Sequence, residues 1–396
     1  MATSGMAAMV AGVQQQGLRT TAMSMRLASR LGRAALYVTV TSILCVLALE
    51  IALRAYFRLP IFTLQDWRAL QVNVLKSGLQ YDALLGWTMA SNSSAPFNTL
   101  DHGIRKNSAG KEALVSGAIL AVGDSYTAGS EVGDAETWPA QLEQILGRRV
   151  INAGVMGYGV DQSVLNAERL LPILKPRIVL VGIYEEDIFR STFKTYNAPK
   201  PYFVEQDGQW RHGNDPVPPA EAYDPEPLYK SLLARLLSAH LALQRHRAWW
   251  FTGPGMRFEQ VSQAPVQTSC HMLEQLHQRL VAEDSVGMVV LQYSGWLYSS
   301  LKRRPWYMEQ VLGCARQFGY DVVDEYEHLD AIARQSLDRL KQHYVMDRTN
   351  SRYGHMSAAG NRLAASLIAE RLQASAAQAL GRVPKVSPAP DQPAMP

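Results

Sequence analysis

The tripeptide Gly123-Asp124-Ser125 is the first part of this sequence that suggests chemistry. It ends an apolar run, residues 117–123, that is typical of a buried strand, and a helical pattern follows it. A serine at such a turn exposes its hydroxyl, and its backbone N–H lies near the positive end of a helix. A nucleophile whose own N–H must hold an oxyanion needs this placement. The pattern predicts Ser125 as a nucleophile, with an ordinary turn as the alternative.

A glycine-rich segment, N-A-G-V-M-G-Y-G at 152–159, follows the next apolar run along the chain. Glycines allow backbone N–H groups to approach a substrate closely. The segment matches neither the G-x-G-x-x-G pattern of dinucleotide-binding proteins nor a phosphate-binding loop that ends in Lys-Ser/Thr. It indicates backbone donors at a site, although glycine-rich turns between strands and helices are common.

A third segment, R-Y-G-H-M-S-A-A-G-N at 352–361, places His355 immediately before the last helical pattern. From such a boundary a base can reach over the edge of a sheet towards a serine. A histidine that only caps a turn is the alternative. If His355 is the base for Ser125, an imidazole nitrogen must lie within about 4 Å of the Ser125 Oγ.

The elements that must position these residues follow a regular alternation. Short apolar segments predict strands at 117–123, 149–154, 177–184, 286–294 and 320–326. Helical periodicity predicts helices at 136–147, 161–175, 267–283, 305–318, 327–343 and 357–380. This order predicts a parallel sheet with helices on its faces. Because a parallel sheet presents ligands at the carboxyl ends of its strands, Ser125 and the glycines are expected at one edge.

Together the three segments resemble the SGNH/GDSL hydrolase superfamily over residues 117–374. Gly123-Asp124-Ser125 matches the first block of the superfamily, Asn152 to Gly157 the second, and His355 with Gly360-Asn361 the fifth. The resemblance implies an α/β fold, the flavodoxin-like three-layer α/β/α sandwich with a central parallel sheet. It also implies a serine esterase without metal or organic cofactor, in which the N–H groups of Ser125 and Gly157 hold the oxyanion.

The sequence departs from the superfamily in the third block, Gly-x-Asn-Asp, whose asparagine donates to the oxyanion. Here the segment reads G-I-Y-E-E-D-I at 182–188, so Asp187 aligns with the aspartate and Glu186 replaces the asparagine. An ionised carboxylate repels an oxyanion, and the loss of one such donor typically costs ~100- to 1000-fold in rate. Another donor must substitute, or Glu186 must point away.

A second departure concerns the acid that orients the histidine. The superfamily usually places an aspartate three residues before the histidine, where this chain has Arg352. Asp347 and Asp187 are the candidates for this acid. Without either, a Ser125–His355 dyad would have to suffice.

The predicted chemistry is acyl transfer on O-acyl esters, most simply O-acetyl esters, of envelope glycans or lipids. Water as acceptor makes the site a hydrolase, and a sugar hydroxyl makes it an O-acetyltransferase. Two other classes remain open. One is an inactive protein of this fold that binds glycan or a protein partner in the envelope; the other is a lipase or thioesterase acting on long acyl chains.

The excess charge of the chain lies at its N-terminal end. Arg19, Arg26, Arg30 and Arg33 occur in residues 1–33 without an acidic residue, and they account for the net charge of +4. The rest of the chain is formally neutral, which gives no electrostatic basis for a nucleic-acid partner.

An apolar segment follows these arginines. Residues 34–49 carry no charge, and extending the segment to Leu53 admits only Glu50. A helix of about 20 residues spans the hydrocarbon core of a bilayer. The positive-inside rule then predicts a cytoplasmic N-terminus and an extracytoplasmic domain after Arg54. A cleaved signal peptide and a buried soluble helix are the alternatives.

The predicted organisation thus runs from an anchor to an envelope domain. Its parts are a cytoplasmic segment (1–33), a transmembrane anchor (34–54), a stalk and lead-in (55–115), a hydrolase-like domain (116–375) and a disordered tail (376–396). An insertion at 190–265 is rich in proline and aromatic residues, and it forms either a lid or a structural or partner-binding surface. Cys270 and Cys314 either pair in an oxidising compartment or are buried free thiols.

Overall fold

The structure of the chain is a computed structural model, and it describes three stretches. These are residues 30–52, 78–219 except 111 and 197, and 258–381 except 302. The chain divides into two compact units, residues 1–67 with 225–254 and residues 68–224 with 255–396. The described part of the first unit is one helix, and the second unit is the α/β domain. Most of the predicted cytoplasmic segment and of the predicted tail lies outside the described residues.

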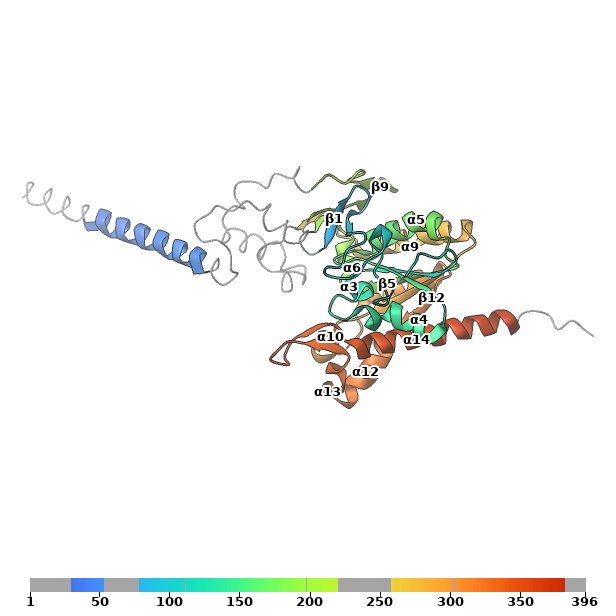
Figure 1. Cartoon of the computed structure of the whole chain (residues 1–396). Helices are drawn as coiled ribbons and strands as arrows, with labels where there is room; N and C mark the ends of the chain where they lie inside the picture. Colours follow the sequence, from blue (N-terminus) through green and yellow to red (C-terminus); the bar gives the residue numbers. More distant parts are fainter. Residues whose placement is uncertain are drawn as a thin grey trace, which may run out of the picture. The chain divides into compact units, whose positions relative to one another are not determined.

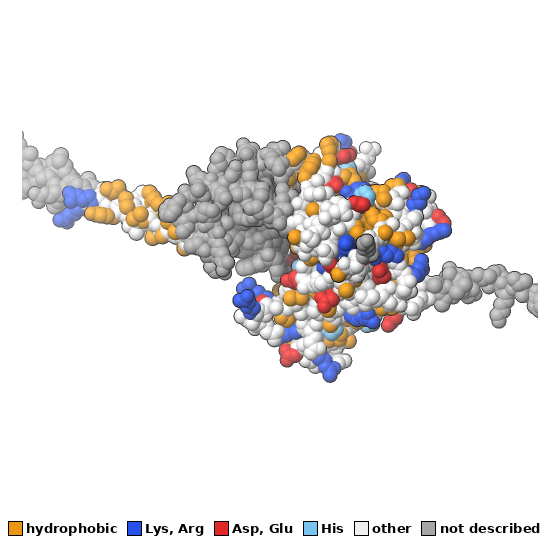
Figure 2. Space-filling model, in the orientation of Figure 1, with side chains coloured by type: hydrophobic (Ala, Val, Ile, Leu, Met, Phe, Trp, Pro, Cys, Tyr) orange, Lys and Arg blue, Asp and Glu red, His pale blue; other side chains and the backbone are white. Residues whose placement is uncertain are grey.

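The helix of the first unit, Arg30–Ala52, coincides with the predicted anchor. It has 23 residues and no buried side chain among its apolar residues. Figure 2 shows its apolar surface with basic side chains at one end. By length and composition this helix is sufficient to cross a membrane.

The centre of the domain is a five-stranded parallel sheet (Figure 1). Its strands are Ile119–Gly123 (β3), Val150–Gly154 (β4), Ile178–Tyr184 (β5), Val286–Gln292 (β11) and Asp321–Asp324 (β12). They lie in the order β12-β11-β5-β3-β4, and every neighbouring pair is parallel. In chain order this is the flavodoxin-like arrangement, in which the direction of the strand order reverses between β3 and β5.

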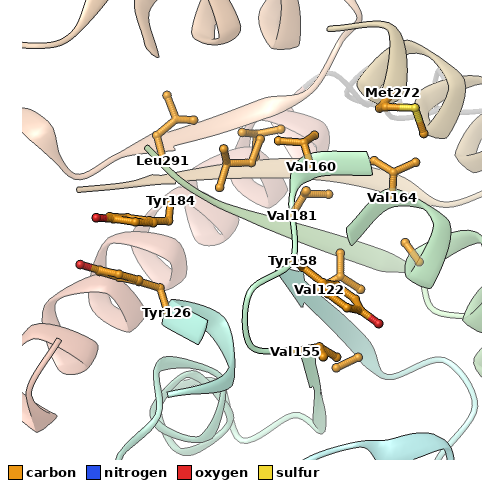
Figure 3. Packing of buried hydrophobic residues seen from close by; sticks show 14 of the residues in the cluster. Val122, Tyr126, Val155, Tyr158, Val160, Val164, Val181, Tyr184, Met272 and Leu291 are labelled. Atoms are coloured by element: carbon orange, nitrogen blue, oxygen red, sulfur yellow. The ribbon is translucent and has the colours of Figure 1, made fainter. Parts of the chain in front are cut away.

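Helices cover both faces of the sheet, because successive side chains of each strand point to opposite sides. Leu120 and Val122 of β3 pack with α5 (Val160–Leu174), α9 (Pro265–Ala282) and α11 (Trp306–Gln317). Figure 3 shows this face, where Val122 and Val181 lie near Val164. Ile119 and Ala121 pack with α4 (Trp138–Leu146) and α14 (Ala358–Gly381) on the other face. The predicted three-layer α/β/α fold is confirmed.

The helix predicted at 327–343 is divided. It forms α12 (Tyr326–Gln335) and α13 (Leu337–Lys341), separated by Ser336 in an extended conformation. The Ser336 Oγ accepts from the N–H of Arg339, so this serine caps the second helix. The other short elements along the domain are α3 (Ser125–Ala128), η1 (Asp101–Gly103), η2 (Asp134–Glu136), α6 (Asp187–Arg190), α10 (Gly295–Ser300), β13 (Tyr344–Met346) and β14 (Tyr353–Met356).

The segment before the sheet is part of the domain and not a stalk. Its hairpin of β1 (Leu79–Asp82) and β2 (Gly86–Met89) buries Trp87, and Ile104 is fully buried. The backbone N–H of Arg105 donates to the carbonyl of Asn152 on the edge strand β4 at 2.9 Å. The expectation of a stalk is therefore wrong from Gly78 onwards, because apolar side chains here complete the core; residues 53–77 lie outside the described residues.

The insertion forms small antiparallel sheets in its described part. β6 (Phe193–Tyr196) lies between β7 (Ala198–Pro199) and β10 (Phe258–Gln260), and β8 (Tyr202–Gln206) pairs with β9 (Gln209–Gly213). A buried ion pair between Lys200 and Asp161 ties the insertion to α5. Residues 220–257 of the insertion lie outside the described residues.

Cys270 of α9 and Cys314 of α11 form a disulfide, which resolves the alternatives left open for these cysteines. The bond closes a loop over a sequence separation of 44 residues. Because a disulfide restricts the unfolded chain, replacing both cysteines by serine should lower the free energy of unfolding by about 2–4 kcal/mol. Urea unfolding of the full chain in detergent measures this, with Cys45→Ser as the control; an unchanged midpoint in the double variant contradicts it.

Candidate active site

Ser125 lies where β3 ends and α3 begins, at the carboxyl edge of the sheet. Asp124 caps α3, because its Oδ1 accepts from the Tyr126 N–H at 2.8 Å. Gly123 is required before this turn, since a Cβ there would lie 2.2 Å from Thr127 Oγ1 and 2.8 Å from the carbonyl oxygen of Gly182. Ser125 is buried, with 8% of its surface exposed.

His355 contacts Ser125 directly. Its Nε2 lies 2.9 Å from the Ser125 Oγ, which is within the distance that the hypothesis required. The histidine belongs to β14, the second strand of the hairpin that precedes α14. Residues 230 positions apart in the sequence are thus brought together, and the imidazole is about one-third exposed.

The carboxylate that binds His355 is that of Glu131. Its Oε2 lies 3.0 Å from His355 Nδ1 and also accepts from the His355 backbone N–H. Gly354 allows this approach, because a Cβ there would lie 2.4 Å from the same oxygen. The hydrogen bond from His355 lowers the pKa of Glu131, so the carboxylate is ionised at neutral pH. With its Nδ1–H directed at Glu131, the imidazole has Nε2 free to accept the Ser125 proton.

The two aspartates predicted as orienting acids are both wrong for that role. Asp187 is buried, and its carboxylate binds the Tyr184 N–H at 2.9 Å and Arg190 Nη1 at 2.7 Å. Asp347 organises the turn of the β13–β14 hairpin by accepting from Thr349 Oγ1 and from two backbone N–H groups. These bonds, led by the one from Thr349, lower the pKa of Asp347 to about 2.

Glu131 was missed because it follows the nucleophile and does not precede the histidine. It lies in the loop after α3, where Gly129 has a φ of 74° and ends the helix. The sequence S-Y-T-A-G-S-E-V-G does contain a usable pattern: an acid between two glycines, six residues after the serine. Tertiary contacts bring this loop to His355, and the local pattern of the sequence does not predict such contacts.

The two backbone N–H groups that were predicted to hold an oxyanion both lack an acceptor. Among the described residues no hydrogen bond is made by the N–H of Ser125 or of Gly157. Gly157 has a φ of 78°, a conformation that favours glycine. A Cβ on Gly157 would lie 3.8 Å from Trp87 Cζ2 and 4.0 Å from Tyr196 Cε1. Aromatic side chains of the lead-in and of the insertion therefore pack next to this loop. Unpaired N–H groups of this kind are what an oxyanion requires.

Asn152, the first residue of the second block and a further candidate for binding the oxyanion or substrate, is not part of this donor set. It is fully buried within β4, and its Oδ1 accepts from the Gly154 N–H at 3.1 Å. Its Nδ2 faces Thr137 Oγ1 at 3.5 Å. The side chain therefore stabilises the end of β4.

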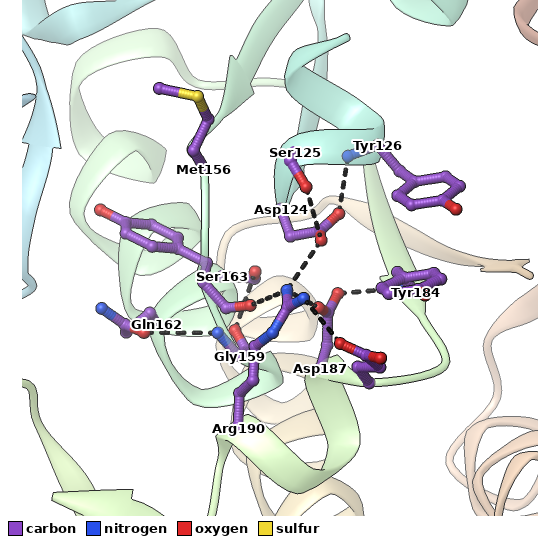
Figure 4. A network of polar contacts seen from close by, with 12 residues as sticks. Asp124, Ser125, Tyr126, Met156, Gly159, Gln162, Ser163, Tyr184, Asp187 and Arg190 are labelled. Carbon is purple, nitrogen blue, oxygen red and sulfur yellow. Dashed lines mark hydrogen bonds and ion pairs between the residues drawn. The ribbon is translucent and has the colours of Figure 1, made fainter. Parts of the chain in front are cut away.

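Arg190 of α6 occupies the space beside the third block (Figure 4). Its Nη1 donates to Asp124 Oδ2 at 2.9 Å, to Asp187 Oδ1 and to the carbonyl of Tyr158. Its Nη2 lies 3.3 Å from Glu186 Oε2. Burial raises the pKa of Glu186, and the Arg190 guanidinium offsets part of that shift. The Glu186 carboxylate thus binds Arg190, and the positive charge of Arg190 offsets the negative charge that would repel an oxyanion.

The hydroxyl of Ser125 has a second neighbour in this network. Asp124 Oδ2 lies 3.1 Å from the Ser125 Oγ and could accept its proton in place of His355 (Figure 4). The bond from Arg190 to the same oxygen reduces the strength of this competing acceptor. On the histidine side, Tyr126 stacks on Tyr184 with ring centres 4.2 Å apart, and the His355 ring lies 5.2 Å from Tyr126. Figure 3 shows the two tyrosines in parallel.

Comparisons with known proteins give solved structures only. No family model matches the chain, and no curated protein is similar to it in sequence. An esterase, EstA, from Pseudoalteromonas sp. is 12% identical, with a TM-score of 0.37 over 66% of this chain and 100% of that chain. An acetyl xylan esterase from Geobacillus stearothermophilus is 14% identical, with a TM-score of 0.39 over 65% of this chain and 96% of that chain. At such scores, the fold rests on the strand order and layers described above, and the chemistry on the site itself.

Proposed function

We propose that this chain is a serine esterase of the SGNH type, with Ser125, His355 and Glu131 as its catalytic residues. The observation that carries the proposal is the chain of hydrogen bonds from Ser125 through His355 to Glu131. It lies at the carboxyl edge of the sheet, where the parallel strands β3 and β4 lead to the unpaired N–H groups of Ser125 and Gly157. Nucleophile, base and orienting acid, together with oxyanion donors, are the parts that acyl transfer needs. Within the described residues no group of His, Cys, Asp or Glu side chains is arranged to hold a metal ion.

The reaction proceeds in two steps. His355 Nε2 takes the proton of Ser125 while the Oγ forms a bond to the ester carbonyl carbon, and the N–H groups of Ser125 and Gly157 stabilise the resulting oxyanion. The C–O bond to the alcohol then breaks, and His355 protonates the leaving oxygen. Water, or a sugar hydroxyl in a transferase, then attacks the acyl carbon and gives its proton to His355. The bond between the acyl carbon and Ser125 Oγ breaks, and His355 returns the proton to the Oγ.

The proposed location is outside the cytoplasm, with the chain anchored by the helix Arg30–Ala52. Arginines without acids precede this helix, which favours a cytoplasmic N-terminus. The disulfide between Cys270 and Cys314 supports an oxidising compartment for the domain. The proposed substrates are therefore O-acyl esters of envelope glycans or lipids.

Ester turnover by the full chain in detergent tests the proposal. We expect release of p-nitrophenol from the acetate to exceed that from the butyrate and octanoate, if the natural acyl group is acetyl. A preference for octanoate favours the lipase or thioesterase instead. A folded chain that turns over none of the three contradicts the esterase and favours the inactive binding protein, which the substitution at Glu186 also supports.

Replacing Glu186 by asparagine should raise kcat for p-nitrophenyl acetate by about ten-fold. The amide restores the donor of the third block, which is worth up to ~100- to 1000-fold where it is fully aligned. Arg190 retains its bonds to Asp124 and Asp187, so we expect the loop to keep its conformation. Initial rates at saturating substrate measure the effect.

Glu186→Gln is the matched control. Its side chain is one methylene longer than that of asparagine, so its amide group lies at a different point. A fall in kcat in Glu186→Asn contradicts the account.

A further inference from the structure

Arg105 lies in the lead-in segment, yet it is buried beneath the loop that carries Glu131. The side chain is 2% exposed, and its guanidinium lies 3.9 Å from the centre of the Phe97 ring. Its Nη1 donates to the carbonyls of Ala128 and Gly129. These are carbonyls that the end of α3 leaves without a helical partner. A cation there also complements the helix end electrostatically.

The same guanidinium binds the far side of the loop. Its Nη2 donates to the carbonyl of Val132 at 2.7 Å, and Asp134 Oδ1 accepts from Nη2 at 3.0 Å and from Nε at 3.1 Å. Asn98, also from the lead-in, donates to the other oxygen of Asp134 at 2.6 Å. Every donor group of the Arg105 side chain is thus engaged with residues 128–134, and Glu131 lies between its contacts.

Glu131 itself has little local support. Its side chain is 39% exposed, and its described partners are the backbone and side chain of His355 together with the close approach of Gly354. A loop of this kind, with glycines on both sides of the acid, has wide conformational freedom unless its backbone is held. The position of the Glu131 carboxylate therefore depends on the contacts that hold the backbone of residues 128–134.

We propose that Arg105 is the positioning residue for Glu131: it binds the backbone before and after this residue and so holds the carboxylate against His355. The inference rests on the proposed function. It also gives the segment before the sheet a role in catalysis, because Arg105 belongs to this segment. The backbone N–H of Arg105 donates to the edge strand β4, which fixes the segment to the sheet. Lysine cannot replace the guanidinium, because an ammonium group cannot reach carbonyls on both sides of the loop in one plane.

A double-mutant cycle on the full chain in detergent tests the coupling. Arg105→Lys should lower kcat for p-nitrophenyl acetate by about 10-fold with KM unchanged, because small displacements of a catalytic group are costly. In the Glu131→Gln background the same substitution should change kcat by less than about 2-fold, since the carboxylate that it positions is already absent. An equal loss in both backgrounds, or no loss in the native one, overturns the proposal.

The matched control is Arg169→Lys. Arg169 is partly buried and, like Arg105, is paired with a carboxylate, Asp82 at 2.7 Å, but it lies on α5 and not in contact with residues 128–134 in any described hydrogen bond. Its replacement should leave kcat within about 2-fold of the native value. If Arg105→Lys does not fold, Asp134→Asn weakens the same contacts more gently. It should lower kcat by about 3-fold in the native background and not in Glu131→Gln.

A proton spectrum provides a readout that does not depend on turnover. A His355 Nδ1–H bonded to a carboxylate gives a resonance at low field, which we expect in the native chain and in Arg169→Lys. It should be lost in His355→Ala and Glu131→Gln, and weakened in Arg105→Lys. A native resonance in Arg105→Lys, or none in the native chain, overturns the proposal. If the chain shows this pattern of resonances but has no esterase activity, Arg105 does position Glu131 and the proposed function is refuted.

Discussion

Replacing Ser125 by alanine is expected to lower kcat for ester hydrolysis by about 10⁶-fold. The nucleophile and base of a serine hydrolase act as one unit, so removal of either costs nearly as much as removal of both. His355→Ala should therefore have an effect of similar size, and the double variant should be hardly slower than either single one. Initial rates with p-nitrophenyl acetate, at enzyme concentrations high enough to detect residual activity, measure all three.

The control for this series is Ser108→Ala. Ser108 is exposed, and its side chain binds Glu112 in the lead-in. It should retain the native rate, which separates loss of the nucleophile from a general effect of removing a hydroxyl. Residual turnover above about one per cent of the native rate in Ser125→Ala contradicts the assignment of the nucleophile, since truncation of a true nucleophile leaves far less.

Replacing Glu131 by glutamine has the second largest expected effect, a loss of about 10³-fold in kcat. Loss of the charge of an orienting acid costs up to ~10⁴-fold in buried triads, because the imidazole takes the wrong tautomer and its charged form is not stabilised. Glu131 is 39% exposed, so water partly replaces it and we expect the smaller loss. KM should stay near its native value, because the carboxylate binds His355 and takes no direct part in the proposed acyl transfer.

Asp347→Asn is the matched control for Glu131. This aspartate, unlike Glu131, lies near His355 in the sequence, but its carboxylate binds the turn at Thr349 and Ser351. The variant should retain kcat within about 2-fold, although it should destabilise the hairpin slightly. If Asp347→Asn loses as much activity as Glu131→Gln, the acid has been assigned to the wrong residue.

The fold was predictable from the sequence because each element carries its own local pattern. All five strands of the sheet were located, since apolar runs such as 178–184 are long enough for buried strands and too short for helices. The helix Arg30–Ala52 was predicted from the uncharged run at 34–49. The division at Ser336 was missed, because the apolar spacing continues across it and only the extended conformation of the serine breaks the helix.

The site was predictable only where a residue follows a strand or precedes a helix. Ser125 and Gly157 meet that condition, and for this reason the sequence alone singles them out. Glu131 and Arg105 do not meet it, because Glu131 lies in the loop after α3 and Arg105 lies in a segment that was predicted to be a stalk and lead-in. Asp347 was chosen for its closeness to His355 in the sequence, whereas the structure brings the acid from the other end of the domain.

The most direct test of the account is to locate the adduct of a serine-directed fluorophosphonate on the folded full chain by peptide mass spectrometry. The account predicts one modified residue, Ser125, with slower labelling in Glu131→Gln and none at this position in Ser125→Ala. A chain that is folded by circular dichroism but remains unlabelled, or carries the adduct on another serine, contradicts the proposed catalytic site.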